Sequence, residues 1–112
     1  MRLAAKALLT WKLAVLLWFM NSKQRKALEA IFSKPTPKTL SWNDIESLFR
    51  AIGCKVIEGE GSRVSFRYII KHEDRQDEEA QGDFHRPHPG KEAKPYQVKK
   101  AAVFLTKIGQ LP

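Results

Sequence analysis

The sequence has a single cysteine, Cys54, among 112 residues. One cysteine excludes an internal disulfide framework and any zinc site made of cysteines alone, and it is compatible with a reducing compartment, so we expect a cytoplasmic protein. Acidic residues are also few, because 12 Asp and Glu stand against 20 Lys and Arg, which gives a net charge of +8. This surplus favours a polyanionic partner, either nucleic acid or an acidic protein. The length excludes a multidomain enzyme.

Residues 1–19 differ from the rest of the chain. Leu3 to Phe19 is almost wholly apolar, as in a signal peptide, but Lys12 interrupts the run and no small-residue cleavage site follows it. The uninterrupted part, 13–20, is too short to span a bilayer, so we expect no membrane partner. The segment is either an apolar leader or the result of a mis-assigned start, with Met20 as the true first residue; we favour the second. A membrane-associated peptide is the remaining alternative.

Residues 20–112 keep a net charge of +5, because the first 19 residues contain three basic and no acidic side chains. Apolar periodicity predicts a single α+β domain here, with the order α-α-β-β-β-α. We expect a three-stranded antiparallel sheet with helices on one face and the other face open to a partner. The predicted helices are 22–32, 41–52 and 95–108, and the predicted strands are 54–57, 63–70 and 83–86. Residues 71–83 are expected to form a solvated loop.

A glycine-rich turn precedes the second strand. Gly59, Gly61 and Ser62 permit a close backbone approach to a phosphate, and Arg63 and Arg67 follow on one face of the strand. Two arginines so placed can pair with phosphate oxygens. The alternative is an ordinary hairpin turn beside a solvated basic face.

Two histidines follow in the string Phe84-His85-Arg86-Pro87-His88-Pro89. Cleaving RNA without a metal needs a base for the 2′-hydroxyl, an acid for the leaving oxygen and a cation for the phosphorane, and imidazole titrates near neutral pH. His85 and His88 are therefore catalytic candidates; the alternative is that each makes only local hydrogen bonds. His72 is expected to be solvated. Because the histidines and Cys54 fit no zinc-binding spacing, we expect neither metal nor cofactor.

Basic residues concentrate near the C-terminus, where 84–109 contain six basic residues and one acidic residue. Those before the last helix lie near its free backbone donors. The alternative is a solvated helical face. The candidate RNA-binding residues are Arg67, Arg86, Lys91, Lys94, Lys99 and Lys100.

Residues 20–109 resemble the HicA family of type II toxin–antitoxin systems. The resemblance rests on Trp42, Asp44, Ile45 and Glu46, on the turn from Glu58 to Val64, on the string 84–89 and on the basic last helix. It implies a small mRNA interferase with a double-stranded-RNA-binding-domain-like fold and a HicB antitoxin. In much of the family a Gly-Ser-His pattern supplies the catalytic histidine, whereas this chain has Gly61-Ser62-Arg63.

The resemblance leads to one hypothesis and one alternative. The hypothesis is an endoribonuclease that cuts mRNA without a metal, with His85, His88 and Arg63 as its catalytic residues. The alternative is a module of the same fold that binds RNA or the antitoxin without cutting. Arg63 at the usual histidine position motivates the alternative.

Overall fold

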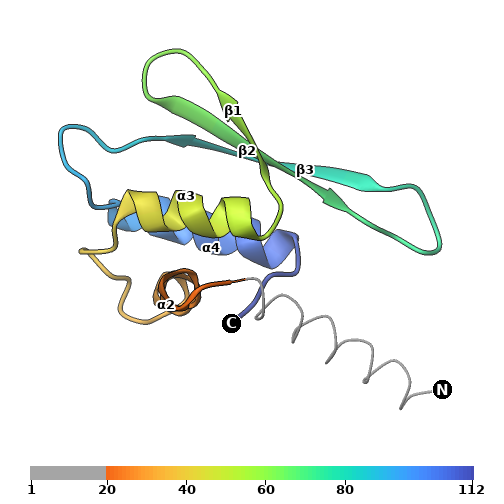
Figure 1. The fold of residues 1–112 in the computed structure, drawn as a ribbon, viewed down its shortest axis with the longest axis horizontal. Coiled ribbons are helices and arrows are strands. Elements are labelled where there is room, and N and C mark those ends of the chain that lie inside the picture. Colours follow the sequence, from red (N-terminus) through yellow and green to blue (C-terminus); the bar gives the residue numbers. More distant parts are fainter. Residues whose placement is uncertain (1–19) are drawn as a thin grey trace.

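The computed structural model describes residues 20–112 and confirms the predicted α+β order (Figure 1). Three helices lie on one side of a three-stranded antiparallel sheet with the strand order β1-β2-β3. The expected leader or mis-assigned start falls in residues 1–19, outside the described part. Within residues 20–112, no helix has the length and apolarity needed to cross a membrane. The elements are α2 (Ser22–Ile31), α3 (Trp42–Ala51), β1 (Lys55–Glu58), β2 (Arg63–Ile70), β3 (Glu78–His85) and α4 (Pro95–Lys107).

The first two described helices each follow a polar N-cap residue, Asn21 or Ser41, and a side-chain hydrogen bond joins them. Asn21 Oδ1 accepts from Gln24 N at 2.8 Å, and Gln24 Oε1 accepts from Asn21 N at 2.9 Å, a reciprocal pair that satisfies two free helix donors. The Gln24 amide also donates to Ser47 Oγ of α3 at 2.9 Å. Ser41 is the N-cap residue of α3, but its side chain makes no capping hydrogen bond.

The sheet buries one of its two faces. Along β2, Val64 and Phe66 are buried while their neighbours Arg63 and Arg67 are exposed, and the same alternation runs through β3. Side chains in a strand point to opposite faces in turn, so burying one set exposes the other. We call the exposed set, on the side away from the helices, the open face.

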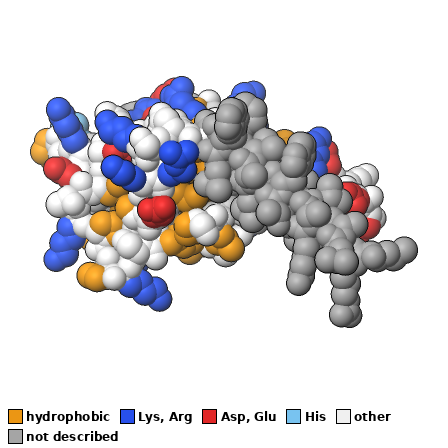
Figure 2. Space-filling view, turned by 60° about the horizontal axis from the view of Figure 1, so that its bottom comes forward, with side chains coloured by type: hydrophobic (Ala, Val, Ile, Leu, Met, Phe, Trp, Pro, Cys, Tyr) orange, Lys and Arg blue, Asp and Glu red, His pale blue; other side chains and the backbone are white. Residues whose placement is uncertain are grey.

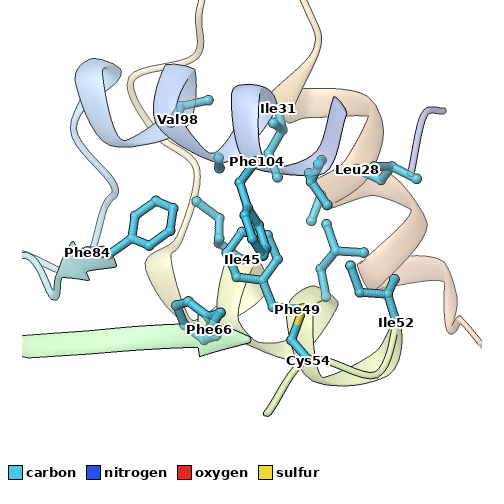
Figure 3. Close-up of a cluster of buried hydrophobic side chains, with 14 of the residues drawn as sticks. Leu28, Ile31, Ile45, Phe49, Ile52, Cys54, Phe66, Phe84, Val98 and Phe104 are labelled. Atoms are coloured by element: carbon cyan, nitrogen blue, oxygen red, sulfur yellow. The ribbon is translucent and has the colours of Figure 1, made fainter. Parts of the chain in front are cut away.

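Aromatic side chains fill the space between the sheet and the helices (Figure 3). The Phe49 ring of α3 lies 4.7 Å from that of Phe66, 5.8 Å from that of Phe84 and 5.5 Å from that of Phe104, measured between centroids. These contacts connect α3, β2, β3 and α4 at a single residue. Phe49 therefore stands at the centre of the core.

The third strand is longer than predicted. It begins at Glu78 rather than Asp83, because β2 pairs with β3 along its whole length, from Arg63 opposite His85 to Ile70 opposite Glu78. Its inward positions include Ala80 and Gly82, which are too small to give a strong apolar alternation in the sequence. The hairpin consequently extends beyond the helices (Figure 1).

The prediction that His72 is solvated was also wrong. Its side chain is only 18% exposed rather than solvated, and its Nε2 lies 3.6 Å from a carboxylate oxygen of Glu78. The extension of β3 explains this difference, since it brings Glu78 next to the end of β2.

Truncating Phe49 to alanine should lower the free energy of unfolding by about 3–5 kcal/mol, because it removes a fully buried ring from the centre of the core. Urea unfolding followed by circular dichroism measures the change. Val103→Ala, at a side chain of α4 that is 71% exposed, is the control and should change stability by less than about 0.5 kcal/mol. Equal effects of the two substitutions would contradict this account of the core.

Candidate nucleic-acid interface

The strand register brings two of the predicted catalytic residues together on the open face. Arg63, the first residue of β2, lies directly opposite His85, the last residue of β3. Both side chains are exposed. Arg63 forms no side-chain hydrogen bond or ion pair with any residue in the range 20–112, so its guanidinium is available to an external anion.

The His85 ring and backbone are both held in place. The ring Nδ1 lies 3.2 Å from Ser62 Oγ, within hydrogen-bond distance, while Nε2 has no hydrogen-bond partner among residues 20–112. The backbone carbonyl of His85 accepts a hydrogen bond of 2.6 Å from the Gln97 amide. The other end of that amide, Oε1, accepts from Lys94 N at 2.9 Å. Gln97 is only 3% exposed, so α4 fixes the end of β3 through a buried polar side chain.

Gln97 was not among the residues predicted from the sequence. It stands on the third position of α4, where Gln or Glu commonly bonds back to the start of a helix, and this was the available signal. Its second bond, to the carbonyl of His85, joins residues twelve positions apart and depends on tertiary structure.

A hollow of about 430 Å³ lies beside the Arg63–His85 pair. Of the predicted residues, its lining includes Gly59, Arg63, His85 and Lys100; His88 does not line it. His88 lies exposed in the loop after β3. The structure therefore brings His85 and Arg63 to one hollow and leaves His88 outside its wall.

The hollow also contains Ser65 and Asp83, which the sequence did not single out. Asp83 Oδ1 accepts from Ser65 Oγ at 2.6 Å and from the Gln81 amide at 2.8 Å. These hydrogen bonds, with the nearby Lys100 and Arg63 charges, hold the pKa of Asp83 below its usual range. Asp83 is therefore an anion in the lining of the hollow, which also contains the carboxyl groups of Glu58 and Glu60 beside the cations Arg63 and Lys100.

The turn that leads into β2 needs glycine at two positions, Gly59 and Gly61. Gly61 has a φ of +60°, in the left-handed region that favours glycine. A Cβ on Gly59 would lie 2.9 Å from that of Arg63, which is too close for a larger residue. Ser62 is exposed at this turn and contacts His85, so the turn positions the histidine whether or not it also approaches a phosphate.

Two arginines predicted to bind RNA already have partners within the chain. Arg67 Nε lies 2.9 Å from the Gln81 amide oxygen and 3.1 Å from a Glu79 carboxylate oxygen. Arg86 donates from Nε to Glu46 at 2.6 Å and from Nη1 and Nη2 to Glu58 at 2.6 and 2.7 Å. An incoming phosphate would compete with these carboxylates.

The Arg86 contacts tie three parts of the fold together. Glu46 belongs to α3 and Glu58 ends β1, while Arg86 follows β3. Hydrogen bonding to the guanidinium lowers the pKa of Glu58, and the two carboxylates raise the pKa of Arg86. Glu46 also accepts from the Trp42 indole at 2.7 Å. Arg86 thus fixes the loop that carries His88 against the helical layer.

The predicted lysines are Lys91, Lys94, Lys99 and Lys100, and all four are exposed. Lys100 Nζ lies 5.2 Å from the centre of the Phe84 ring and within the wall of the hollow, so α4 contributes positive charge there. Figure 2, which views the helical side, shows Lys and Arg side chains scattered with hydrophobic ones between them. The charge surplus alone therefore does not mark the interface.

Among residues 20–112, no group of three His, Cys, Asp or Glu side chains is placed to hold a metal ion. Cys54 is buried in the core, and burial raises the pKa of its thiol to about 12. A protonated, enclosed thiol is a poor nucleophile.

The family model described as the HicA toxin of bacterial toxin–antitoxin systems matches residues 42–109. The match begins at α3 and runs to the end of α4, so it contains the sheet and the hollow, while α2 precedes it. Neither the curated proteins nor the solved structures gave a match.

Replacing Gln97 with leucine should lower the free energy of unfolding by about 1–3 kcal/mol, because the partly buried His85 carbonyl and Lys94 N–H then lose their partner. Chemical denaturation measures the loss. Gln76→Leu, at an exposed residue in the loop between β2 and β3, is the matched control and should have little effect. If Gln97→Leu were as stable as the control, α4 would not hold β3 through this amide.

Proposed function

The chain belongs to the HicA toxin family of bacterial toxin–antitoxin systems, and we propose that it binds and cleaves messenger RNA on the open face of its sheet. Family membership implies an antitoxin partner. We further propose that this partner is a HicB-type antitoxin and that both act in the cytoplasm. The observation that carries the proposal is the pairing of His85 with Arg63 beside a hollow.

The chemistry assigned to His85 is proton transfer. In RNA cleavage the ribose 2′-oxygen forms a bond to the adjacent phosphorus, the bond from phosphorus to the 5′-oxygen breaks, and a 2′,3′-cyclic phosphate remains. His85 takes the proton of the 2′-hydroxyl at Nε2, since Nδ1 faces Ser62. The Ser62 and Gln97 contacts limit the motion of ring and backbone, and such preorganisation aids a general base.

The developing negative charge needs cations. Arg63, directly across the strand pair from His85 and without a side-chain hydrogen bond or ion pair among residues 20–112, can donate to two phosphate oxygens at once. Lys100 adds a second positive charge from α4. Together they stabilise the phosphorane at the position where His85 acts.

The leaving oxygen needs a proton, and we assign this role to His88, the second of the two predicted catalytic histidines. It belongs to the loop that Arg86 ties to Glu46 and Glu58, and that loop is also bonded to the start of α3 through Trp42 N and Lys91 O at 2.9 Å. His88 lies outside the wall of the hollow, so RNA would have to extend from the hollow to this loop. Side chains supply every group in this scheme, so we propose that cleavage is independent of metal.

A second candidate function rests on Arg63. This residue stands where the Gly-Ser-His pattern has its histidine, and an arginine there binds phosphate without transferring a proton. A binding module of the same fold would hold RNA, or an antitoxin, on the open face without cutting. Cleavage and binding measured on the same variants separate the two functions.

His85→Ala should lower the rate of RNA cleavage by 10²- to 10⁴-fold, because it removes the general base, while RNA affinity changes by less than a few-fold. Gel analysis of a fluorescent RNA measures the rate, and anisotropy measures the affinity. EDTA should leave the wild-type rate unchanged, and His88→Ala should also slow cleavage.

The control for these variants is His72→Ala, in the loop at the far end of the β2–β3 hairpin, which should cleave like the wild type. Intact RNA with the wild-type protein, together with tight binding, would favour the binding module. Unchanged cleavage by His85→Ala would remove His85 from the mechanism.

The double variant Lys99→Gln, Lys100→Gln should weaken RNA binding and flatten its salt dependence. Each lost phosphate contact lowers the slope of log affinity against log salt by about 0.7 for single strands. Titrations between low and moderate salt measure the slope. Lys26→Gln with Lys34→Gln removes the same charge from α2 and the loop after it, away from the sheet, and should bind almost as the wild type does. Equal losses in the two double variants would mean that net charge, not α4, governs binding.

A further inference from the structure

We infer that Asp83 is a base-reading residue: it accepts a hydrogen bond from the exocyclic amino group of a nucleobase next to the scissile phosphate. The inference rests on the proposed function, because it names how the same hollow would choose its substrate. Adenine, cytosine and guanine carry such an amino group, and uracil does not.

The position of Asp83 is the first observation. It lies on β3 two residues before His85, so the two side chains share the open face and are roughly 6–7 Å apart along the strand. Both line the hollow. A nucleotide whose phosphate contacts Arg63 and His85 therefore places a neighbouring group within reach of Asp83.

The way the carboxylate is held is the second observation. Both of its protein donors, the Ser65 hydroxyl and the Gln81 amide, bond to the same oxygen, Oδ1. Oδ2 accepts no hydrogen bond from any residue in the range 20–112. The carboxylate is thus oriented by one oxygen and offers the other, with both its lone pairs, to a ligand.

The charge of Asp83 decides which part of RNA it contacts. Its hydrogen bonds and the nearby cations keep its pKa low, so it remains an anion that only accepts hydrogen bonds and is a weak base. An anion repels phosphate, so Asp83 does not bind the backbone charge that Arg63 attracts. Base amino groups are donors, and single-stranded RNA presents them on splayed-out bases.

Neighbouring residues on the open face support the role of Asp83 in selecting a base. Gln81 links Asp83 to Arg67, which in turn pairs with Glu79, so a hydrogen-bonded row runs along β2 and β3. This row fixes the side chain that offers Oδ2. Glu73, an exposed acidic residue in the loop between β2 and β3, lies outside both this row and the hollow, which makes it a control of the same charge.

The test compares four oligodeoxynucleotides that each contain one ribonucleotide, with the base next to the scissile phosphate being A, C, G or U. Full-length wild-type protein should cleave the substrates with amino-bearing bases on the order of 10-fold faster than the uracil substrate, the value of one charge-assisted hydrogen bond. Asp83→Asn should reverse the preference, because the Ser65 and Gln81 donors hold the amide oxygen at the Oδ1 position, and the NH2 group at the Oδ2 position can then donate to uracil O4. Glu73→Gln should keep the wild-type preference.

A second variant at the same position keeps the test valid if Asp83→Asn fails to fold. Asp83→Thr removes the carboxylate but keeps a good strand residue, so it should abolish the preference without reversing it. Equal wild-type rates on all four substrates would overturn the inference while leaving the proposed function standing. A loss of rate in Asp83→Asn that is the same for every base would overturn it as well, because Asp83 would then act on the sugar or the phosphate and not on the base.

Failure of the proposed function has a different signature. If the wild-type protein cleaves none of the substrates, the enzyme proposal fails, and the affinities of the four oligonucleotides then decide the inference. Tighter binding of amino-bearing bases that reverses in Asp83→Asn supports base reading by a non-catalytic module. Affinities that do not depend on the base overturn it.

Discussion

Burial of a single face of the sheet is the constraint on which the other features depend. Phe66 and Phe84 must face the helices to pack around Phe49, and strand geometry then forces the intervening side chains outward. Arg63, Asp83 and His85 reach the open face for this reason and not because of their own chemistry. A shift of one residue in the register would exchange the two faces, so the same packing that stabilises the domain also determines which residues a partner can meet.

Polar contacts hold the end of β3 and the loop beyond it, directly after the last core ring, Phe84. Gln97 anchors the end of β3 from α4, and Arg86 anchors the loop beyond it to α3 and β1. Both are polar contacts between residues far apart in sequence, and each serves a candidate catalytic histidine, His85 in the first case and His88 in the second. Rigid support of this kind suits a site whose reacting groups come from different elements.

Much of the fold could be predicted from the sequence, because apolar spacing is a local signal: the element order and the full span of β2 were predicted correctly. The start of β3 was not, since Ala80 and Gly82 contribute little hydrophobicity and their strand conformation depends on pairing with β2. The pairing of His85 with Arg63 needed the register. Gln97 and Asp83 were missed for the same reason, because their partners lie on other elements or across the sheet.

The strand register also bears on the missing histidine of the Gly-Ser-His pattern. Arg63 and His85 are cross-strand neighbours, so a side chain at either position reaches the same hollow. A histidine on β3 and an arginine on β2 can therefore supply the same two groups, a base and a cation, as the opposite arrangement would. Ser62 contacts the His85 ring across the strand pair, which fits this exchange of places. The arginine at position 63 therefore leaves the role of general base to His85 on the neighbouring strand.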